Sequence, residues 1–171
     1  LAKELIQEYS DLSKDDLGNS SISVKVAGRI MLRRLMGKAS FTTIQDMSAQ
    51  IQLYLREDTL SNYDDFKTWD IGDIIGVEGE LFKTNTGELS IKVTEAILLT
   101  KSLKPLPEKH QGLVDVEQRY RKRYLDLLVN EEAREVFLAR SKIISETRNY
   151  FDSSGFIAVS YTHLTLPTTP V

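Results

Sequence analysis

The chain has 171 residues, of which 41% are hydrophobic and 27% are charged, and its formal net charge is −3. This composition excludes an intrinsically disordered chain, and no apolar run reaches the roughly 20 residues that a membrane-spanning helix requires. Because the chain has no cysteine, disulfides and thiolate metal sites are excluded as well. The expectation is a soluble, cytoplasmic protein.

Residues 1–21 predict an N-terminal helix followed by a connector. The stretch "LAKELIQEYS" has a helical composition, whereas "DLSKDDLGNSS" mixes charge, glycine and serine in the manner of a connector. The folded part is therefore predicted to start near Ile22. The sequence begins with Leu1 and shows no signal-like segment, so we expect the chain to start inside a longer protein.

Residues 22–101 carry the alternating apolar pattern of β-strands. Gly28 interrupts the apolar row of the first strand, which indicates a bulge or a bend. A short helix is predicted in "NYDDFKTW" and a hairpin in "KTNTGE". The strands are predicted in "ISVKVAGRI", in residues 39–46, after the turn "MSAQ", in "GDIIGVEGELF" and in "LSIKVTEAILLT". Five short strands with one helix between the third and the fourth predict a five-stranded Greek-key barrel, the OB-fold.

After Thr100 the alternation stops, and the two prolines of "KSLKPLPEKHQG" indicate a linker over residues 102–114. The stretch "DVEQRYRKRYLDLLV" is predicted to be one helix with Asp115 as its N-cap. Asn130 is predicted to cap a long helix that Gly155 ends, and "GFIAV" to begin a strand. The fold class is therefore mainly β with α: a barrel, a linker and helices.

Phe41 raises the question of function, because it shares the polar face of its strand with Thr43 and Gln45. In an OB-fold the outer face of strands 2 and 3 holds single-stranded nucleic acid, and an exposed aromatic ring there gives a base a surface to stack on. Gln52, on the polar face of the next strand, has an amide that donates and accepts, as a base edge requires. An outward phenylalanine alone is more often a scattered surface residue, but the combination favours nucleic-acid binding.

Residues 23–57 carry six cations against two anions, a local balance of +4 on an acidic chain. Such a stretch is typical of a nucleic-acid or phosphate surface, with a merely solvated face as the alternative. Arg29, Arg33 and Arg34 are the candidates for meeting phosphates or stacking on bases. Glu88, beside the hairpin tip, is either a hairpin residue or a base contact. The sequence predicts no catalytic residue and no metal site, since no Ser/His/Asp set or carboxylate pair has the spacing for one.

Three stretches, "VAGRIMLRRLMGKASFTTIQD", "WDIGDIIGVEGELFKTNTGELSI" and "HQGLVDVEQRYRKRYLDL", resemble the N-terminal part of class II lysyl-tRNA synthetases of the bacterial type. Aspartyl and asparaginyl synthetases share the barrel and its stacking phenylalanine, but they match these motifs less specifically. The resemblance implies that residues 22–101 bind the uridine-rich anticodon of a tRNA. It implies that Phe41 stacks on the central base, Gln52 reads its edge, Arg34 supports binding and Glu88 contacts a base.

The resemblance also implies an ATP- and Mg²⁺-dependent lysine–tRNA ligase that works as a homodimer when complete. Residues 115–157 would be the truncated start of its class II α+β catalytic domain, and the motifs that bind ATP and lysine are absent. We therefore expect this N-terminal fragment to bind tRNA, to hold no cofactor and to be inactive alone. Residues 158–171 are unlike any synthetase and are predicted to be a non-native tail. The alternatives are a stand-alone OB-fold module for single-stranded RNA, or an aspartyl- or asparaginyl-type fragment.

Overall fold

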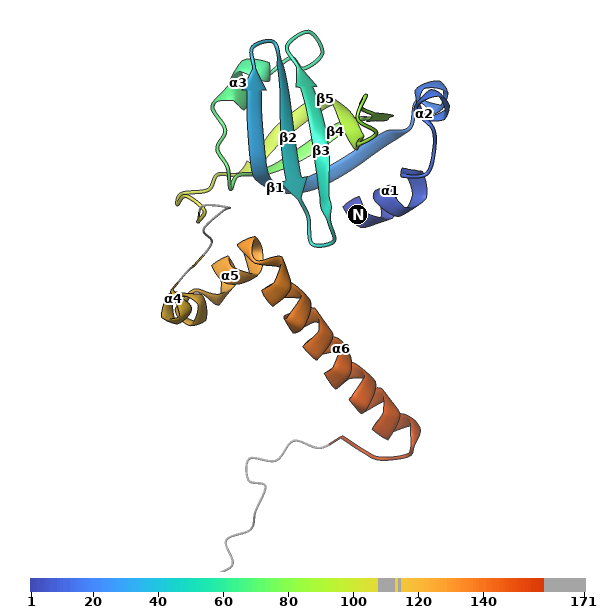
Figure 1. The fold of residues 1–171 in the computed structure, drawn as a ribbon, viewed down its shortest axis with the longest axis vertical. Helices are drawn as coiled ribbons and strands as arrows, with labels where there is room; N and C mark the ends of the chain where they lie inside the picture. Colours follow the sequence, from blue (N-terminus) through green and yellow to red (C-terminus); the bar gives the residue numbers. More distant parts are fainter. Residues whose placement is uncertain (108–112, 114, 159–171) are drawn as a thin grey trace, which may run out of the picture. The chain divides into compact units, whose positions relative to one another are not determined.

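A computed structural model describes residues 1–107, residue 113 and residues 115–158. It divides into two compact units, residues 1–106 and 107–171, which are described here one at a time. The first unit contains the strands and the second contains helices (Figure 1). Within the described part of the chain, no helix is long and apolar enough to cross a membrane.

The strands of the first unit pair in a closed ring in the order β1-β2-β3-β5-β4. β3 and β5 pair in parallel and the other neighbours pair antiparallel. In Figure 1, β2 and β3 cross in front of β4 and β5. The predicted five-stranded OB-fold barrel is confirmed. The strands are β1 (Ser23–Met36), β2 (Ala39–Gln45), β3 (Gln50–Arg56), β4 (Ile74–Lys83) and β5 (Leu89–Thr100).

Strand alternation builds the core, because every second side chain points into the ring. The helix α3 (Tyr63–Lys67) lies between β3 and β4, as predicted, and buries Tyr63 and Phe66. Phe66 in turn meets Trp69 edge to face, with ring centroids 5.6 Å apart. Alternation predicts that the apolar residues of the strands point inward, and those of β2, β3 and β4 are buried: Ile44, Ile51, Leu53, Leu55, Ile75, Val77 and Leu81. Ile22, Val24 and Val26, on the apolar side predicted for the first strand, are partly buried against the same core.

β1 bends so that its first half pairs with β4 and its second half with β2. The bulge lies at Met31, where the register with β2 shifts between Ile30 and Leu32, so of the two alternatives predicted for Gly28 the bulge is wrong. Gly28 lets the backbone of β1 approach the backbone of β2 closely, since a Cβ there would lie 2.8 Å from the carbonyl oxygen of Gln45. The bulge reverses the inward and outward phase of the rest of β1.

The N-terminal segment is part of the fold, so the prediction that folding starts near Ile22 is wrong. Beyond α1 (Ala2–Tyr9), the expected connector contains a second helix, α2 (Lys14–Ser20), capped by the Ser13 hydroxyl. Ala2 and Leu17 are buried with the barrel core. Helix α2 could not be predicted from the apolar pattern, because it has one buried apolar side chain and no helical repeat of apolar residues.

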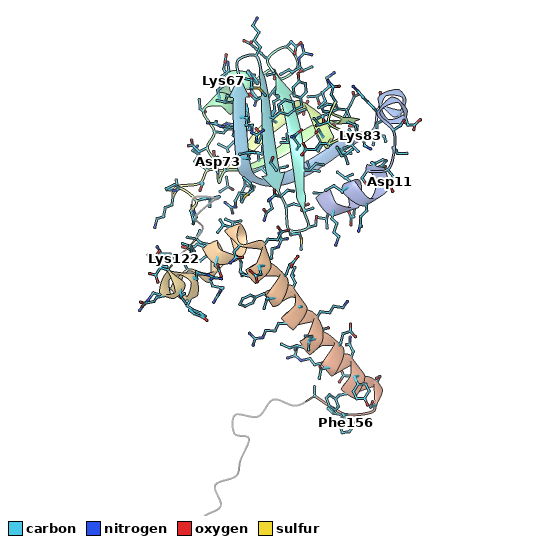
Figure 2. All side chains as sticks on the ribbon, viewed as in Figure 1. Asp11, Lys67, Asp73, Lys83, Lys122 and Phe156 are labelled. Carbon is cyan, nitrogen blue, oxygen red and sulfur yellow. The ribbon has the colours of Figure 1, made fainter. Side chains whose placement is uncertain are left out.

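Two lysines connect this N-terminal segment to the hairpin that joins β4 and β5. Figure 2 shows Lys83 on the side of the barrel where α1 and α2 lie. Its Nζ donates to the carbonyl oxygen of Ser10 at 2.6 Å, and Lys14 Nζ donates to Asn85 Oδ1 at 2.8 Å. The N-terminal helices therefore support the β4–β5 hairpin.

The second unit contains α4 (Val116–Arg121), α5 (Arg123–Val129) and α6 (Glu131–Ser153). The predicted caps Asp115 and Asn130 are confirmed, and Gly155, with φ of +83°, follows the end of α6. Phe156 to Ala158 are not in a strand, so the predicted strand in "GFIAV" does not start within the described residues. Its last residue lies outside them.

The predicted single helix over 115–129 is wrong, because the chain leaves helical geometry at Lys122. The break lets side chains from both short helices surround one buried carboxylate, that of Asp126. Arg119 Nε donates to it at 3.0 Å, Arg123 Nη1 at 2.5 Å and Asn130 Nδ2 at 3.3 Å. Burial alone would raise the pKa of Asp126, but these donors and their charge lower it. The "RYRKRYLD" stretch therefore forms the break between α4 and α5, which the hydrogen bonds to Asp126 stabilise.

Asp46 fastens α1 to the turn between β2 and β3. Its carboxylate accepts hydrogen bonds from the amides of Ala2, Ser48 and Ala49 and from the Ser48 hydroxyl, at 2.6–2.8 Å. Burial by itself would raise the pKa of this carboxyl, but the four hydrogen bonds outweigh it and lower the pKa from 3.8 to about 2. The ionised form is therefore the one that the fold stabilises.

We expect Asp46→Asn to lower the free energy of unfolding by roughly 2 kcal/mol at neutral pH. Because the folded-state pKa is the lower one, this contribution is present above pH 4 and is lost as the pH falls from 4 toward 2. Denaturant unfolding at several pH values measures it. Asp11→Asn is the control, since Asp11 is exposed and makes no hydrogen bond to a described residue. A difference that stays constant from pH 7 to pH 2 would contradict the assignment.

Candidate nucleic-acid interface

Strand register places two aromatic rings side by side on the outer face of the barrel. Phe41 of β2 pairs with Tyr54 of β3, while the neighbouring Ser40 and Thr42 are buried on the inner side. Arg34 of β1 lies opposite Phe41, and Lys92 of β5 lies opposite Tyr54. Phe41 therefore faces outward, as the alternation predicted, in a row with a cation at each end.

A third ring continues these two, and we call Phe41, Tyr54 and Phe82 the aromatic row. The ring centroids of Phe41 and Tyr54 are 4.9 Å apart with planes inclined by 34°, and those of Tyr54 and Phe82 are 5.8 Å apart. Both phenylalanines are half-buried. Each ring is thus held by its neighbour, which leaves part of its surface free for a base.

Gln52 lies two residues before Tyr54 on the same face of β3, and its amide is held at both ends. Its Nε2 donates to Glu88 Oε2 at 3.0 Å, and Ser90 Oγ donates to its Oε1 at 2.9 Å. Ser90 is fully buried, whereas Glu88 is exposed. The structure therefore brings together Gln52 and Glu88, which the sequence analysis selected separately. One N–H and one oxygen lone pair of the amide remain available.

The predicted hairpin in "KTNTGE" is confirmed, and it positions Glu88. The Thr84 amide donates to the carbonyl of Glu88 and the Gly87 amide to the carbonyl of Thr84, both at 3.0 Å. Gly87 has φ of +84°, a left-handed conformation that glycine adopts without steric cost. The Glu88 side chain is thereby fixed beside the outer face of β3.

Arg34 is the arginine that the structure brings to the aromatic row. It is exposed, and its side chain forms no hydrogen bond or ion pair with any described residue. An arginine in this position has a free guanidinium with five donors, which suits a phosphate or the face of a base.

Arg33 and Arg29 are not brought to the row. Arg33 lies on the other side of β1, opposite the buried Thr42, and donates to the carbonyls of Phe66, Lys67 and Trp69. It therefore completes the C-terminal end of α3. Arg29 faces outward near the middle of β1, where its Nη1 donates to the Gly72 carbonyl at 2.7 Å.

Sequence analysis missed Tyr54, Phe82 and Ser90. Tyr54 had a signal, because it shares the alternation phase of Gln52 on β3. Phe82 and Ser90 had none, since they come to this face only through the pairing of Ser90 with both Gln52 and Phe82. Among the described residues no group of three or more His, Cys, Asp or Glu side chains is arranged to hold a metal ion.

Comparisons with known families agree with this geometry. Residues 24–99 match the model "OB-fold nucleic acid binding domain", and residues 115–170 match "tRNA synthetases class II (D, K and N)". The chain thus joins a segment similar to nucleic-acid-binding OB-folds to a segment similar to class II tRNA synthetases.

The relatives give the particular member. The chain is 54% identical over 160 residues to "Lysine--tRNA ligase" of Bacillus cytotoxicus and 56% identical over 161 residues to that of Aromatoleum aromaticum. These alignments cover 92% and 93% of this chain, which spans about a third (32%) of the length of each relative. The chain is therefore a homologue of the lysine–tRNA ligases, and the predicted resemblance is confirmed.

The second family match includes residues that the sequence analysis set aside. It runs to residue 170, whereas residues 158–171 were predicted to be a non-native tail. Residues 159–171 lie outside the described residues, and their assignment as foreign stays a prediction.

Arg33→Ala and Arg34→Ala form a matched pair with opposite expected effects. Arg33→Ala should lower the free energy of unfolding by about 1–3 kcal/mol, because three carbonyls at the end of α3 lose a charged donor. Arg34→Ala should leave stability unchanged and should reduce the salt dependence of RNA binding by about 0.7 in log K per log salt. Thermal unfolding and salt titrations measure the two. Equal effects of both variants on either quantity would contradict the placement of these arginines.

Proposed function

We propose that the outer face of β1, β2 and β3 binds the anticodon stem-loop of a lysine-accepting tRNA. The observation that carries this proposal is the aromatic row, with Arg34 and Lys92 at its sides and the amide of Gln52 beside it on the same face of β3. The family match over residues 24–99 and the lysine–tRNA ligase relatives support it.

Each side chain has a distinct part in this proposal. The free surface of the Phe41 ring stacks on the central base of the anticodon, while Tyr54 packs beside that ring. Gln52 offers one donor and one acceptor to the edge of that base. Arg34 contacts a phosphate or a neighbouring base, and it binds without sequence preference if the contact is to phosphate.

The whole-enzyme activity is part of the same proposal. A lysine–tRNA ligase activates lysine with ATP, assisted by Mg²⁺, and transfers the lysyl group to its tRNA. Among the described residues, no group of three or more His, Cys, Asp or Glu side chains is arranged to hold such a metal ion. We assign ATP, magnesium and lysine to parts of the relatives that this chain does not match, and we expect the chain alone to be inactive. A homodimeric, cytoplasmic complete enzyme is part of the proposal.

Phe41→Ala tests the stacking role. If a base stacks on this ring, the variant should bind a uridine-rich anticodon hairpin about 1–3 kcal/mol more weakly than the wild type. Isothermal calorimetry measures the affinity, and circular dichroism checks that the barrel still folds. Met36→Ala is the control, because Met36 is an exposed apolar residue near the end of the same β-hairpin. An unchanged affinity in Phe41→Ala would rule out the proposed face.

Gln52→Ala tests base reading, with Gln50→Ala as the matched control on the same face of β3. Gln50 bonds to Gln45 at 2.8 Å and lies away from Glu88 and Ser90. We expect Gln52→Ala to weaken the hairpin with the lysine anticodon by roughly 1–3 kcal/mol more than a hairpin with a changed central base. Gln50→Ala should affect both hairpins little. An equal loss on both hairpins in Gln52→Ala would mean that Gln52 positions the RNA and does not read it.

A further inference from the structure

The side-chain amide of Gln52 is fixed by two partners that belong to other elements. Glu88, at the tip of the β4–β5 hairpin, accepts from Nε2 at 3.0 Å. Ser90, on β5, donates to Oε1 at 2.9 Å from a fully buried position. The parallel pairing of β3 with β5 sets Gln52 directly opposite Ser90. The amide therefore has a built support on both sides.

These partners determine that the amide nitrogen of Gln52 faces Glu88 and that its oxygen faces Ser90. An ionised carboxylate only accepts hydrogen bonds, so the atom facing Glu88 must be the amide nitrogen. Ser90 has one hydroxyl hydrogen, and the oxygen of Gln52 is its nearer acceptor, at 2.9 Å against 3.4 Å for the Glu88 carbonyl. Rotating the amide by half a turn would oppose two oxygens at Glu88. Glu88 therefore sets the orientation, and the Ser90 hydroxyl, which can donate or accept, donates to the amide oxygen that this orientation presents to it.

The orientation of the amide matters because uracil and cytosine present opposite patterns of hydrogen-bond donors and acceptors at positions 3 and 4 of the ring. Uracil offers a carbonyl acceptor at position 4 and an N–H donor at position 3. Cytosine offers an amino donor at position 4 and an acceptor at position 3. A glutamine amide can pair with either base along this edge, but the two pairings need amides that differ by half a turn. An amide free to turn would thus separate the two bases poorly.

We propose that Ser90 and Glu88 are positioning residues that lock the Gln52 amide in the orientation that accepts uridine and rejects cytidine. This inference rests on the proposed function, in which a uridine-rich anticodon lies on the aromatic row. It gives Glu88 a role that acts through Gln52, and it assigns a role to Ser90, whose side chain is inaccessible to the RNA. Phe41 holds the plane of the base, and the locked amide selects among bases that fit that plane.

The test compares two hairpins that differ only in a central uridine or a central cytidine, each titrated into the wild type, Ser90→Ala and Glu88→Gln. The wild type should prefer the uridine hairpin by about 5- to 150-fold, the range of one bidentate pair. Glu88→Gln should lose most of that preference and Ser90→Ala part of it, and the affinity of both variants for the cytidine hairpin should stay the same or rise because the amide turns more freely. A residue with only a structural role would weaken both hairpins alike.

Thr94→Ala is the control, since it removes another hydroxyl of β5 that bonds to the Glu78 carbonyl at 3.1 Å and not to Gln52. It should keep the wild-type preference. Glu88 is exposed, so Glu88→Gln reports on the lock even if Ser90→Ala disturbs the packing. An unchanged preference in Glu88→Gln and in folded Ser90→Ala would overturn the lock while leaving the proposed function intact. A wild type that binds neither hairpin would overturn the proposed function itself, and the lock with it.

Discussion

The short parallel pairing of β3 with β5 is the contact on which the barrel and its outer face both depend. It joins Gln52 to Ser90, Leu53 to Ile91 and Tyr54 to Lys92. The middle pair is fully buried in the core, while the pairs on either side form the outer face. Because strand side chains alternate, a slip of one residue would put Leu53 outside and would separate Gln52 from its partners. The same three rungs therefore close the ring and assemble the site.

The fold engages most of the positively charged side chains of residues 23–57, which the composition does not show. Among the six cations of residues 23–57, most are engaged in the fold: Lys25 with Glu78, Arg29 with the Gly72 carbonyl, Arg33 with the end of α3, and Arg56 with Asp58. Arg34 and Lys38 make no side-chain hydrogen bond or ion pair with the described residues. The local excess of positive charge thus overstates the number of free cations, and the free arginine is the one beside Phe41.

The sequence was sufficient for features that depend on local alternation and insufficient for those that depend on register. Alternation predicted the five strands, the inward set around Leu53 and the outward position of Phe41. It did not separate Arg33 from Arg34, because the bulge at Met31 reverses the phase of β1 and turns Arg34 to the outer face. The contacts of Gln52 with Ser90 and Glu88 join residues 38 and 36 positions apart, so no local pattern could reveal them. The burial of Leu17 against the barrel core is likewise a tertiary effect.

Nuclear magnetic resonance of the ¹⁵N-labelled chain tests most directly whether the aromatic row is the surface that RNA contacts. During titration with a uridine-rich anticodon hairpin, the side-chain NH₂ signals of Gln52 and the backbone amides near Phe41 and Tyr54 should shift most. The NH₂ signals of Gln50, on the same face but away from the row, should shift little. Largest changes around Lys25, Glu78 and Ile97, on β1, β4 and β5, would place the RNA elsewhere on the barrel and would contradict this assignment.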